Sequence, residues 1–355
     1  EFRRVLFRSY VDGAPSTLIE DAPYAKSVTK AASRIFAAYG ETVKYCKAGD
    51  ARDWTTTSDA GFLPVQLQQD TGDACVAVGT YQNKLAVFFP SSVQTWVVAV
   101  DPSTNAIDQR LYGVGSLAPL TLGNFANDLA FLSPFGFRSM TVRSQTDQVD
   151  DLDIGVQVDG LVKETAKATE LLGVNAFDPV GLWIHEIGQY WCVFDEGSTS
   201  KIWAYSYSKT SKIACWSEYE LPIRIQAIAS LNGKVYLRDE NTLYEWDAST
   251  YTDNGTSIPV EVQMACQNAK TPGVDKQIYG ADAVFEGTAQ LSFKYDPRDL
   301  GKESIPQSIT GDSSPGQFIP VEIVATSVAP VIRHEADEAF EFTQLSIFFN
   351  SLAVT

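Results

Sequence analysis

Residues 78–89, VGTYQNKLAVFF, contain two apolar runs separated by a short polar pair, which is the pattern of a β-hairpin. The same pattern recurs in residues 122–133, LGNFANDLAFLS, and in residues 228–239, IASLNGKVYLRD. Asparagine and glycine tolerate the positive φ angles that tight hairpin turns need. The expected turns are therefore Asn83-Lys84, Asn127-Asp128 and Asn232-Gly233.

The hairpins recur at a regular interval. Two looser hairpins contain Gly40 and Gly188, and the five turn markers Gly40, Asn83, Asn127, Gly188 and Gly233 lie 43, 44, 61 and 45 residues apart. A period in the forties that is made of short strands is typical of a β-propeller with four strands per blade. The sequence therefore predicts a unit of about 44 residues repeated at least five times. A sandwich array with similar spacing is the alternative.

The one long interval contains an insertion. Residues 160–173, GLVKETAKATELLG, combine leucines at both ends with alanines and interleaved charges, and glycine stands at each border. This pattern favours a helix. We therefore expect one helix inserted between the third and fourth hairpins.

Strands within such an array must be apolar on both faces, because neighbouring blades cover both sides of each sheet. A second motif in the outer hairpins is a tryptophan that follows a polar residue, at Trp54, Trp96, Trp216 and Trp246. Aromatic rings contribute large buried areas. These tryptophans are therefore expected to pack between blades rather than to stack on a ligand.

The repeat stops after Tyr251, and a turn-rich segment follows. Beyond it the strands lengthen and are separated by Gly, Pro and Ser stretches, as in residues 277–296, QIYGADAVFEGTAQLSFKYD. The sequence thus predicts an all-β chain with a β-propeller domain over residues 10–255 and a small antiparallel β-sandwich over residues 256–355.

Residues 1–9, EFRRVLFRS, resemble the translation of a widely used short-read sequencing adapter. We exclude them from the fold prediction as an artefact. On this interpretation the propeller domain is incomplete at its N-terminus, and no prediction about a signal peptide follows.

Composition limits the function classes. The formal net charge is -17, without the basic patch by which nucleic-acid binders displace counterions from phosphates, so tight DNA binding is not expected. No run of eighteen apolar residues predicts a membrane span. The five widely spaced cysteines favour buried reduced thiols over a disulfide framework.

Motifs of catalysis are weak throughout the sequence. The acidic cluster Asp147, Asp150, Asp151 and Asp153 suggests either a calcium site or, preferably, a solvated loop, because EF-hand spacing is absent. His185 and Glu186 are neighbours, and in a strand they would point to opposite faces. We therefore predict no catalytic, cofactor-binding or metal-binding residues, and no enzymatic activity.

Residues 175–222, NAFDPVGLWIHEIGQYWCVFDEGSTSKIWAYSYSKTSKIACWSEYELP, resemble the tail-hub and packaged-DNA stabilisation proteins of short-tailed bacteriophages. The preceding helix, GDARDWTT at residues 49–56 and NKLAVFFPSSVQTW at residues 83–96 stand in the order found in that family. The resemblance implies a structural virion protein of the tail, located between the portal or adaptor and the distal tail, that lines or closes the DNA channel.

Two function classes follow from these observations. The first is the structural tail component, made in the bacterial cytoplasm, assembled as a homo-oligomeric ring and in contact with passing DNA without binding it tightly. The alternative is a carbohydrate-binding or glycoside-processing β-propeller with carboxylates at the mouth of its channel. Host-surface recognition is a third reading that also fits a phage protein.

Overall fold

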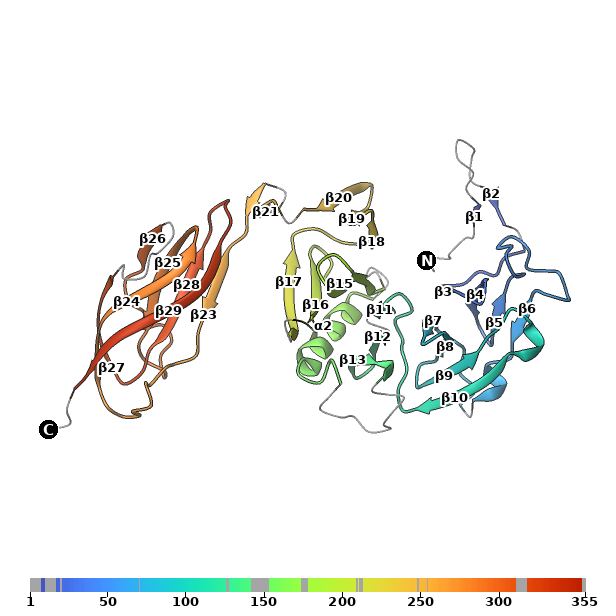
Figure 1. Cartoon of the computed structure of the whole chain (residues 1–355), viewed down its shortest axis with the longest axis horizontal. Coiled ribbons are helices and arrows are strands. Elements are labelled where there is room, and N and C mark those ends of the chain that lie inside the picture. Colours follow the sequence, from blue (N-terminus) through green and yellow to red (C-terminus); the bar gives the residue numbers. More distant parts are fainter. Residues whose placement is uncertain are drawn as a thin grey trace. The chain divides into compact units, whose positions relative to one another are not determined.

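The computed structural model describes residues 8–9, 17–19, 21–69, 71–125, 128–141, 153–173, 178–208, 210, 213–247, 249–253, 255–310 and 318–352. The chain divides into two compact units, Glu1–Trp246 and Asp247–Thr355 (Figure 1). The sequence placed this division later, between residues 255 and 256. Every strand pair described is antiparallel.

The first unit contains five consecutive sheets of three or four strands in its described residues. Sheet one comprises β3 (Val28–Ala31), β4 (Arg34–Tyr39), β5 (Thr42–Tyr45) and β6 (Gly61–Leu63). Sheet two comprises β7 (Ala77–Tyr81), β8 (Lys84–Phe88), β9 (Ser92–Val97) and β10 (Ala106–Tyr112). Sheet three comprises β11 (Gly123–Phe125), β12 (Asp128–Ser133) and β13 (Gly136–Ser139).

Sheet four comprises β14 (Val180–Ile184), β15 (Gln189–Asp195), β16 (Ser200–Ser208) and β17 (Ile213–Leu221). Sheet five comprises β18 (Ala227–Leu231), β19 (Lys234–Asp239) and β20 (Thr242–Trp246). A two-stranded ribbon of β1 (Arg8–Ser9) and β2 (Thr17–Leu18) precedes them. Sheets three and five have three described strands, where the repeat predicted four.

The sheets form a β-propeller-like array. Within each sheet the strands follow one another in chain order, so that every pairing is a hairpin. The first strands of neighbouring sheets also contact one another: β3 meets β7, β11 meets β14, and β14 meets β18, while β7 meets β12. The fold class predicted from the repeat is therefore confirmed for this unit.

Both faces of the inner sheets are buried, as the apolar strands predicted. On β8, Leu85 and Val87 pack against sheet one, whereas Ala86 and Phe88 pack against sheet three. On β15 the same alternation directs Tyr190 towards sheet three and Trp191 towards sheet five. Burial of a large apolar side chain contributes about 1.5–3 kcal/mol, so these interfaces between sheets form the core of the array.

Three of the four predicted tryptophans pack between sheets. Trp96 is buried between sheets one and two. Trp216 stacks on Phe137 of sheet three, with ring centroids 4.4 Å apart. Trp246 meets Trp191 of sheet four edge to face at 4.9 Å. The Trp54 indole N–H donates to the carbonyl of Ala51 in its own loop, 2.9 Å away.

The turn assignments need correction at three places. The predicted pair Asn127-Asp128 is not the turn of the third hairpin, because Asp128 is the first residue of β12 and pairs with Phe125. The second hairpin turns at Gln82-Asn83, where φ is +46° and +62°, one residue before the predicted pair. Gly40 lies between β4 and β5, and the first turn of sheet one is Ala32-Ser33, with φ of +46° and +59°. Alanine and serine carry no sequence signal for positive φ, so the marker shifted to the glycine of the next turn.

The inserted helix is α2 (Asp159–Leu171), close to the predicted residues 160–173. Its buried face includes Val162 and Thr165, and the Trp203 indole donates to the Thr165 hydroxyl at 3.3 Å. Arg138 of β13 anchors the start of the helix through two hydrogen bonds to the Asp159 carboxylate, of 2.7 and 2.8 Å. Fixed by these contacts, the helix covers parts of sheets three and four.

The second unit is a sandwich of two antiparallel sheets, which confirms the predicted class. One sheet has the order β23-β28-β25-β26, with β23 (Val260–Gln263), β25 (Thr288–Lys294), β26 (Gln307–Thr310) and β28 (Ala329–His334). The other has the order β27-β24-β29, with β24 (Lys276–Glu286), β27 (Ile319–Ala325) and β29 (Glu341–Ser351). A short ribbon, β21 (Thr252–Asp253) with β22 (Thr256–Ser257), precedes them.

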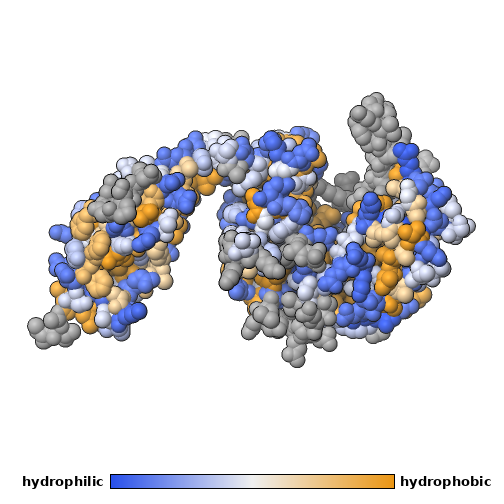
Figure 2. Space-filling model, viewed as in Figure 1, coloured by the Kyte–Doolittle hydropathy of each residue, from blue (hydrophilic) through white to orange (hydrophobic). Residues whose placement is uncertain are grey.

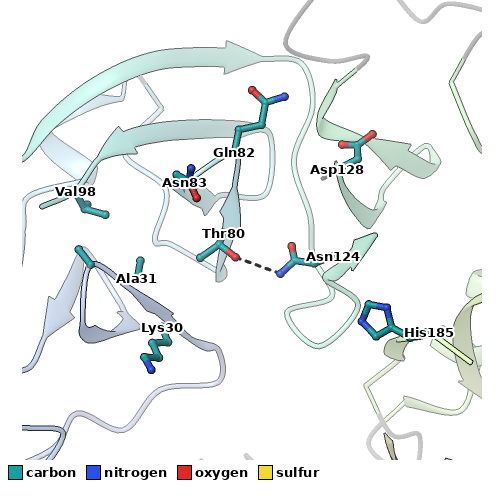
Figure 3. A pocket seen from close by; sticks show the side chains of 10 residues that line it. Lys30, Ala31, Thr80, Gln82, Asn83, Val98, Asn124, Asp128 and His185 are labelled. Atoms are coloured by element: carbon teal, nitrogen blue, oxygen red, sulfur yellow. Dashed lines mark hydrogen bonds between the residues drawn. The ribbon is translucent and has the colours of Figure 1, made fainter. Parts of the chain in front are cut away.

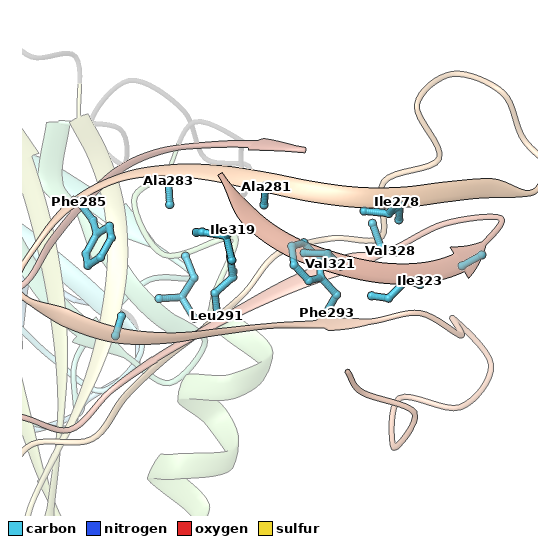
Figure 4. Packing of buried hydrophobic residues seen from close by; sticks show 13 residues of the cluster. Ile278, Ala281, Ala283, Phe285, Leu291, Phe293, Ile319, Val321, Ile323 and Val328 are labelled. Carbon is cyan, nitrogen blue, oxygen red and sulfur yellow. The ribbon is translucent and has the colours of Figure 1, made fainter. Parts of the chain in front are cut away.

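One apolar core joins the two sheets of the sandwich. Phe285 and Ile278 of β24 face Leu291 and Phe293 of β25 across it (Figure 4). The sequence of β27, IPVEIVA, alternates, so that Ile319, Val321 and Ile323 are buried and the residues between them are exposed. This is the pattern of sheets with one buried and one solvated face.

All five cysteines are free thiols, as predicted, but only three are buried. Cys215 and Cys266 are exposed. Hydrophilic residues are spread over the surfaces of both units (Figure 2). Within the described part of the chain, no helix has the length and apolarity that crossing a membrane requires.

Candidate functional site

Sheets one to four line a common cavity of about 1080 Å³, sheets one, two and four at their first hairpin turns and sheet three with strand residues Asn124 and Asp128. We call it the axial cavity. Its walls come from β3 and its turn, β7 and its turn, the segment after β9, β11, β12 and the turn after β14 (Figure 3). The lining residues are Lys30, Ala31, Ala32, Thr80, Gln82, Asn83, Val98, Asn124, Asp128 and His185.

Chain topology places these residues together. The first strands of neighbouring sheets contact one another, so the turns that follow these strands also lie close together. A hydrogen bond joins two of the sheets at the cavity, because the Asn124 amide donates to the Thr80 hydroxyl at 3.2 Å (Figure 3). At sheet one, Arg34 is fully buried directly after the Ala32-Ser33 turn and donates to the carbonyls of Cys46 and Val100, at 2.9 and 2.6 Å.

Asp128 is the carboxylate among the lining residues, and it accepts hydrogen bonds from groups in or beside its own sheet. Its Oδ1 accepts the backbone N–H of Thr141 at 2.9 Å and that of Leu129 at 2.7 Å, and its Oδ2 accepts the Ser139 hydroxyl. These three donors all belong to the same sheet or follow it directly, so the Asp128 carboxylate supports local structure.

His185 is exposed and is oriented by a neighbour. The Trp183 indole N–H donates to His185 Nδ1 at 3.0 Å, and the two rings meet edge to face at 6.1 Å. In the neutral ring this assigns the proton to Nε2. In a catalytic triad, by contrast, Nδ1–H donates to a carboxylate. His185 therefore presents a hydrogen-bond donor and lacks the arrangement of a catalytic base.

The polar groups that line the axial cavity are thus three amides, the Thr80 hydroxyl and the His185 ring, with Asp128 as the anion and Lys30 as the cation. Such groups can form hydrogen bonds with a polar ligand or with water. Among the residues that the structure describes, no group of three His, Cys, Asp or Glu is placed to hold a metal ion. The lining offers hydrogen bonding without an evident nucleophile.

The motifs singled out in the sequence are not brought together here. Asp147, Asp150 and Asp151 lie outside the described residues. Asp153 is buried beside Arg138, 3.7 Å away, and accepts the backbone N–H groups of Ser139 and Ile154. For Asp153, a solvated loop was therefore the wrong expectation.

His185 and Glu186 occupy the turn between β14 and β15, so the strand assumed for them was wrong. Glu186 faces the next turn, because a Cβ placed on Gly233 would lie 3.8 Å from its side chain. Sequence reasoning did not predict the residues that line the axial cavity. In the sequence, Gln82, Asn83 and Asn124 indicated only turns and strands, and nothing indicated that their amides would line one cavity.

The fold and the cavity together define a propeller-like array with a polar, amide-lined axial face. No family model matches the chain, and no curated protein matches it. Among solved structures, a chain described as the AfRom2 CNH domain is similar over 93% of this chain and 86% of its own length, at 7% identity and a TM-score of 0.34. At that level the similarity carries no argument about fold or function.

Proposed function

We propose that this protein is a structural component of a short-tailed bacteriophage tail. It would be a hub or head-completion part between the portal or adaptor and the distal tail, lining or closing the DNA channel. The observation that carries the proposal is the resemblance of residues 175–222 to that family. These residues include all of sheet four and follow α2 directly, in the order that the family has.

The charge of the chain supports a role beside DNA without tight binding. The formal charge is -17, and Lys30 is the cation among the residues that line the axial cavity. DNA affinity depends mainly on lysine and arginine contacts to phosphates, and like charges repel. A neutral to acidic channel wall would let the duplex slide past.

In this proposal the protein has no enzymatic activity. It is made in the host cytoplasm, assembles with copies of itself into a ring and ends in the virion. Rings arise when a head-to-tail interface repeats with a rotation that closes. Sedimentation analysis and electron microscopy of the purified protein test this, with closed rings expected. A protein that stays monomeric at its highest soluble concentration would contradict self-assembly.

A charge-insertion experiment tests the axial cavity as a DNA-facing surface. The wild type is expected to bind duplex DNA weakly near physiological salt, and N83K/N124K to bind more tightly. Two added phosphate contacts should steepen the salt dependence by about two units of log–log slope. The control Q290K/Q307K adds the same charge at exposed positions of the second unit and should change binding less. Tight, salt-sensitive binding by the wild type would overturn the proposal.

The alternative, a glycoside-processing propeller, receives less support from the cavity. Retaining and inverting mechanisms both need two carboxyl groups facing one substrate. Asp128 is the one carboxylate among the lining residues, and it is held within its own sheet. The amides would suit carbohydrate binding without hydrolysis, and N83A in a glycan-binding assay would reveal it.

A further inference from the structure

The second unit exposes three aromatic rings on the outer face of the β27-β24-β29 sheet. Tyr279, Phe318 and Phe348 form this aromatic platform. Their ring centroids lie 6.1, 6.4 and 6.1 Å apart and their planes differ by only 22–27°. These three residues are 42%, 53% and 38% exposed, respectively.

A β-bulge creates the platform. The register of β24 shifts between Ile278 and Gly280 against both neighbouring strands. Before the bulge Ile278 faces the core, and after it Ala281 and Ala283 do. Tyr279 and Gly280 therefore both belong to the outer side, where Gly280 pairs with Phe348.

The missing side chain of Gly280 leaves room for a ring. A Cβ at Gly280 would lie 2.1 Å from the Phe318 ring, so Phe318 crosses the sheet directly over the glycine. Covering this glycine explains the position of Phe318. It does not account for the two other rings, which lie beside it and stay open to solvent.

Polar pairs flank the platform at both ends along the strands. Gln277 lies opposite Asn350 on one side, and Asp282 lies opposite Ser346 on the other. Glu322 is exposed on the neighbouring strand, between the pairs that join Ile323 to Ile278 and Pro320 to Gly280. Ser346 to Asn350 spans about 13 Å at the usual strand rise.

We propose that this face binds a neutral oligosaccharide. The C–H face of a pyranose ring packs on an aromatic ring, while amides and carboxylates bind its hydroxyl groups. Nucleic acids also stack on aromatic rings, but they need a basic surrounding. Here the charged neighbours are Asp282 and Glu322, which disfavour phosphate, sulfate and uronate groups. The length of the platform with its flanks suits a short chain rather than a single sugar.

The test uses the full chain on an array of neutral oligosaccharides, followed by calorimetric titration of the best-bound sugar. We expect binding that Y279A and F348A each weaken about tenfold, because one stacking contact contributes up to about a factor of ten. F348Y retains the ring and should retain binding. F62A removes an exposed aromatic residue of the first unit and is the matched control.

Three outcomes would overturn the proposal: no neutral sugar is bound, binding is unchanged in Y279A and F348A, or Y279A abolishes self-association of the protein instead. The last result would assign the platform to contacts between copies of the chain. N83A separates this site from the axial cavity, because it should leave binding at the platform unchanged. Circular dichroism of each variant verifies that the sandwich is folded.

Discussion

Replacing Arg138 with methionine should destabilise the first unit strongly. Arg138 is 2% exposed, and its guanidinium lies between the carboxylates of Asp153 and Asp159, at 3.7 and 2.7 Å. Without it the fully buried Asp153 carboxylate loses the charge of this arginine. Breaking a buried pair from one side costs about 3–5 kcal/mol.

The expected loss lies at the lower end of that range. Two backbone N–H groups still donate to Asp153, and the methionine retains part of the packing of the arginine stem. We therefore expect a loss of about 3 kcal/mol. With a urea m-value of about 2–3 kcal/mol/M, the unfolding midpoint should fall by about 1 M.

Tryptophan fluorescence measures this unit selectively, because all seven tryptophans precede residue 247. The control K234M breaks the exposed Lys234–Glu245 pair and should change stability by less than about 1 kcal/mol. The triple variant R138M/D153N/D159N should recover much of the loss, because neither carboxylate that Arg138 paired with is charged any longer. A shift for R138M as small as that for K234M would refute the reasoning.

Three further outcomes are expected. Arg333 lowers the pKa of Glu303 to about 2. The stability that this pair contributes is therefore fully present above the unfolded-state pKa near 4.5 and is lost as the pH falls through about 2. In R333M, NMR titration should show the titration midpoint of the Glu303 carboxyl return towards 4.5. G123A should lower the free energy of unfolding by at least about 2 kcal/mol, because the new Cβ would lie 2.5 Å from the buried ring of Tyr190. G160A in α2 places its Cβ in open space and should leave stability unchanged or raise it. Urea unfolding of the two variants compares these effects. A thiol reagent at mildly alkaline pH should label only the two exposed cysteines quickly and all five after unfolding, because burial raises the pKa of the three others. The thiol prediction would be wrong if a third cysteine were labelled quickly. The Glu303 prediction would be wrong if its titration midpoint did not shift in R333M, and the glycine prediction would be wrong if G123A and G160A were equally stable.

The sequence predicted the architecture because local signals carry it. Asn232-Gly233 marks its turn directly, and the apolar runs of β8 and β15 require covered faces. The inserted helix was found from composition and bordering glycines to within a few residues. These features depend on residues that are close in the chain.

The sites depend on contacts that the sequence does not encode locally. The Ala32-Ser33 turn has no residue that announces positive φ, so one wall of the axial cavity was invisible. The polar groups of the cavity come from four sheets, and their proximity requires the order of the array. At Tyr279 the bulge changes which residues face solvent, and the alternation pattern alone does not locate that change.

The strand order of the two units implies different times of folding during synthesis. In the array, each sheet pairs strands that are consecutive in the chain, so a sheet can form as soon as its own hairpins leave the ribosome. In the sandwich, β24 pairs with β29, and β23 pairs with β28. Loops of that length must close before the pairing stabilises them, which slows folding. The sheets of the array can therefore form before β29 is available to pair with β24. During that time the apolar face of the β24 sheet is exposed and accessible to chaperones.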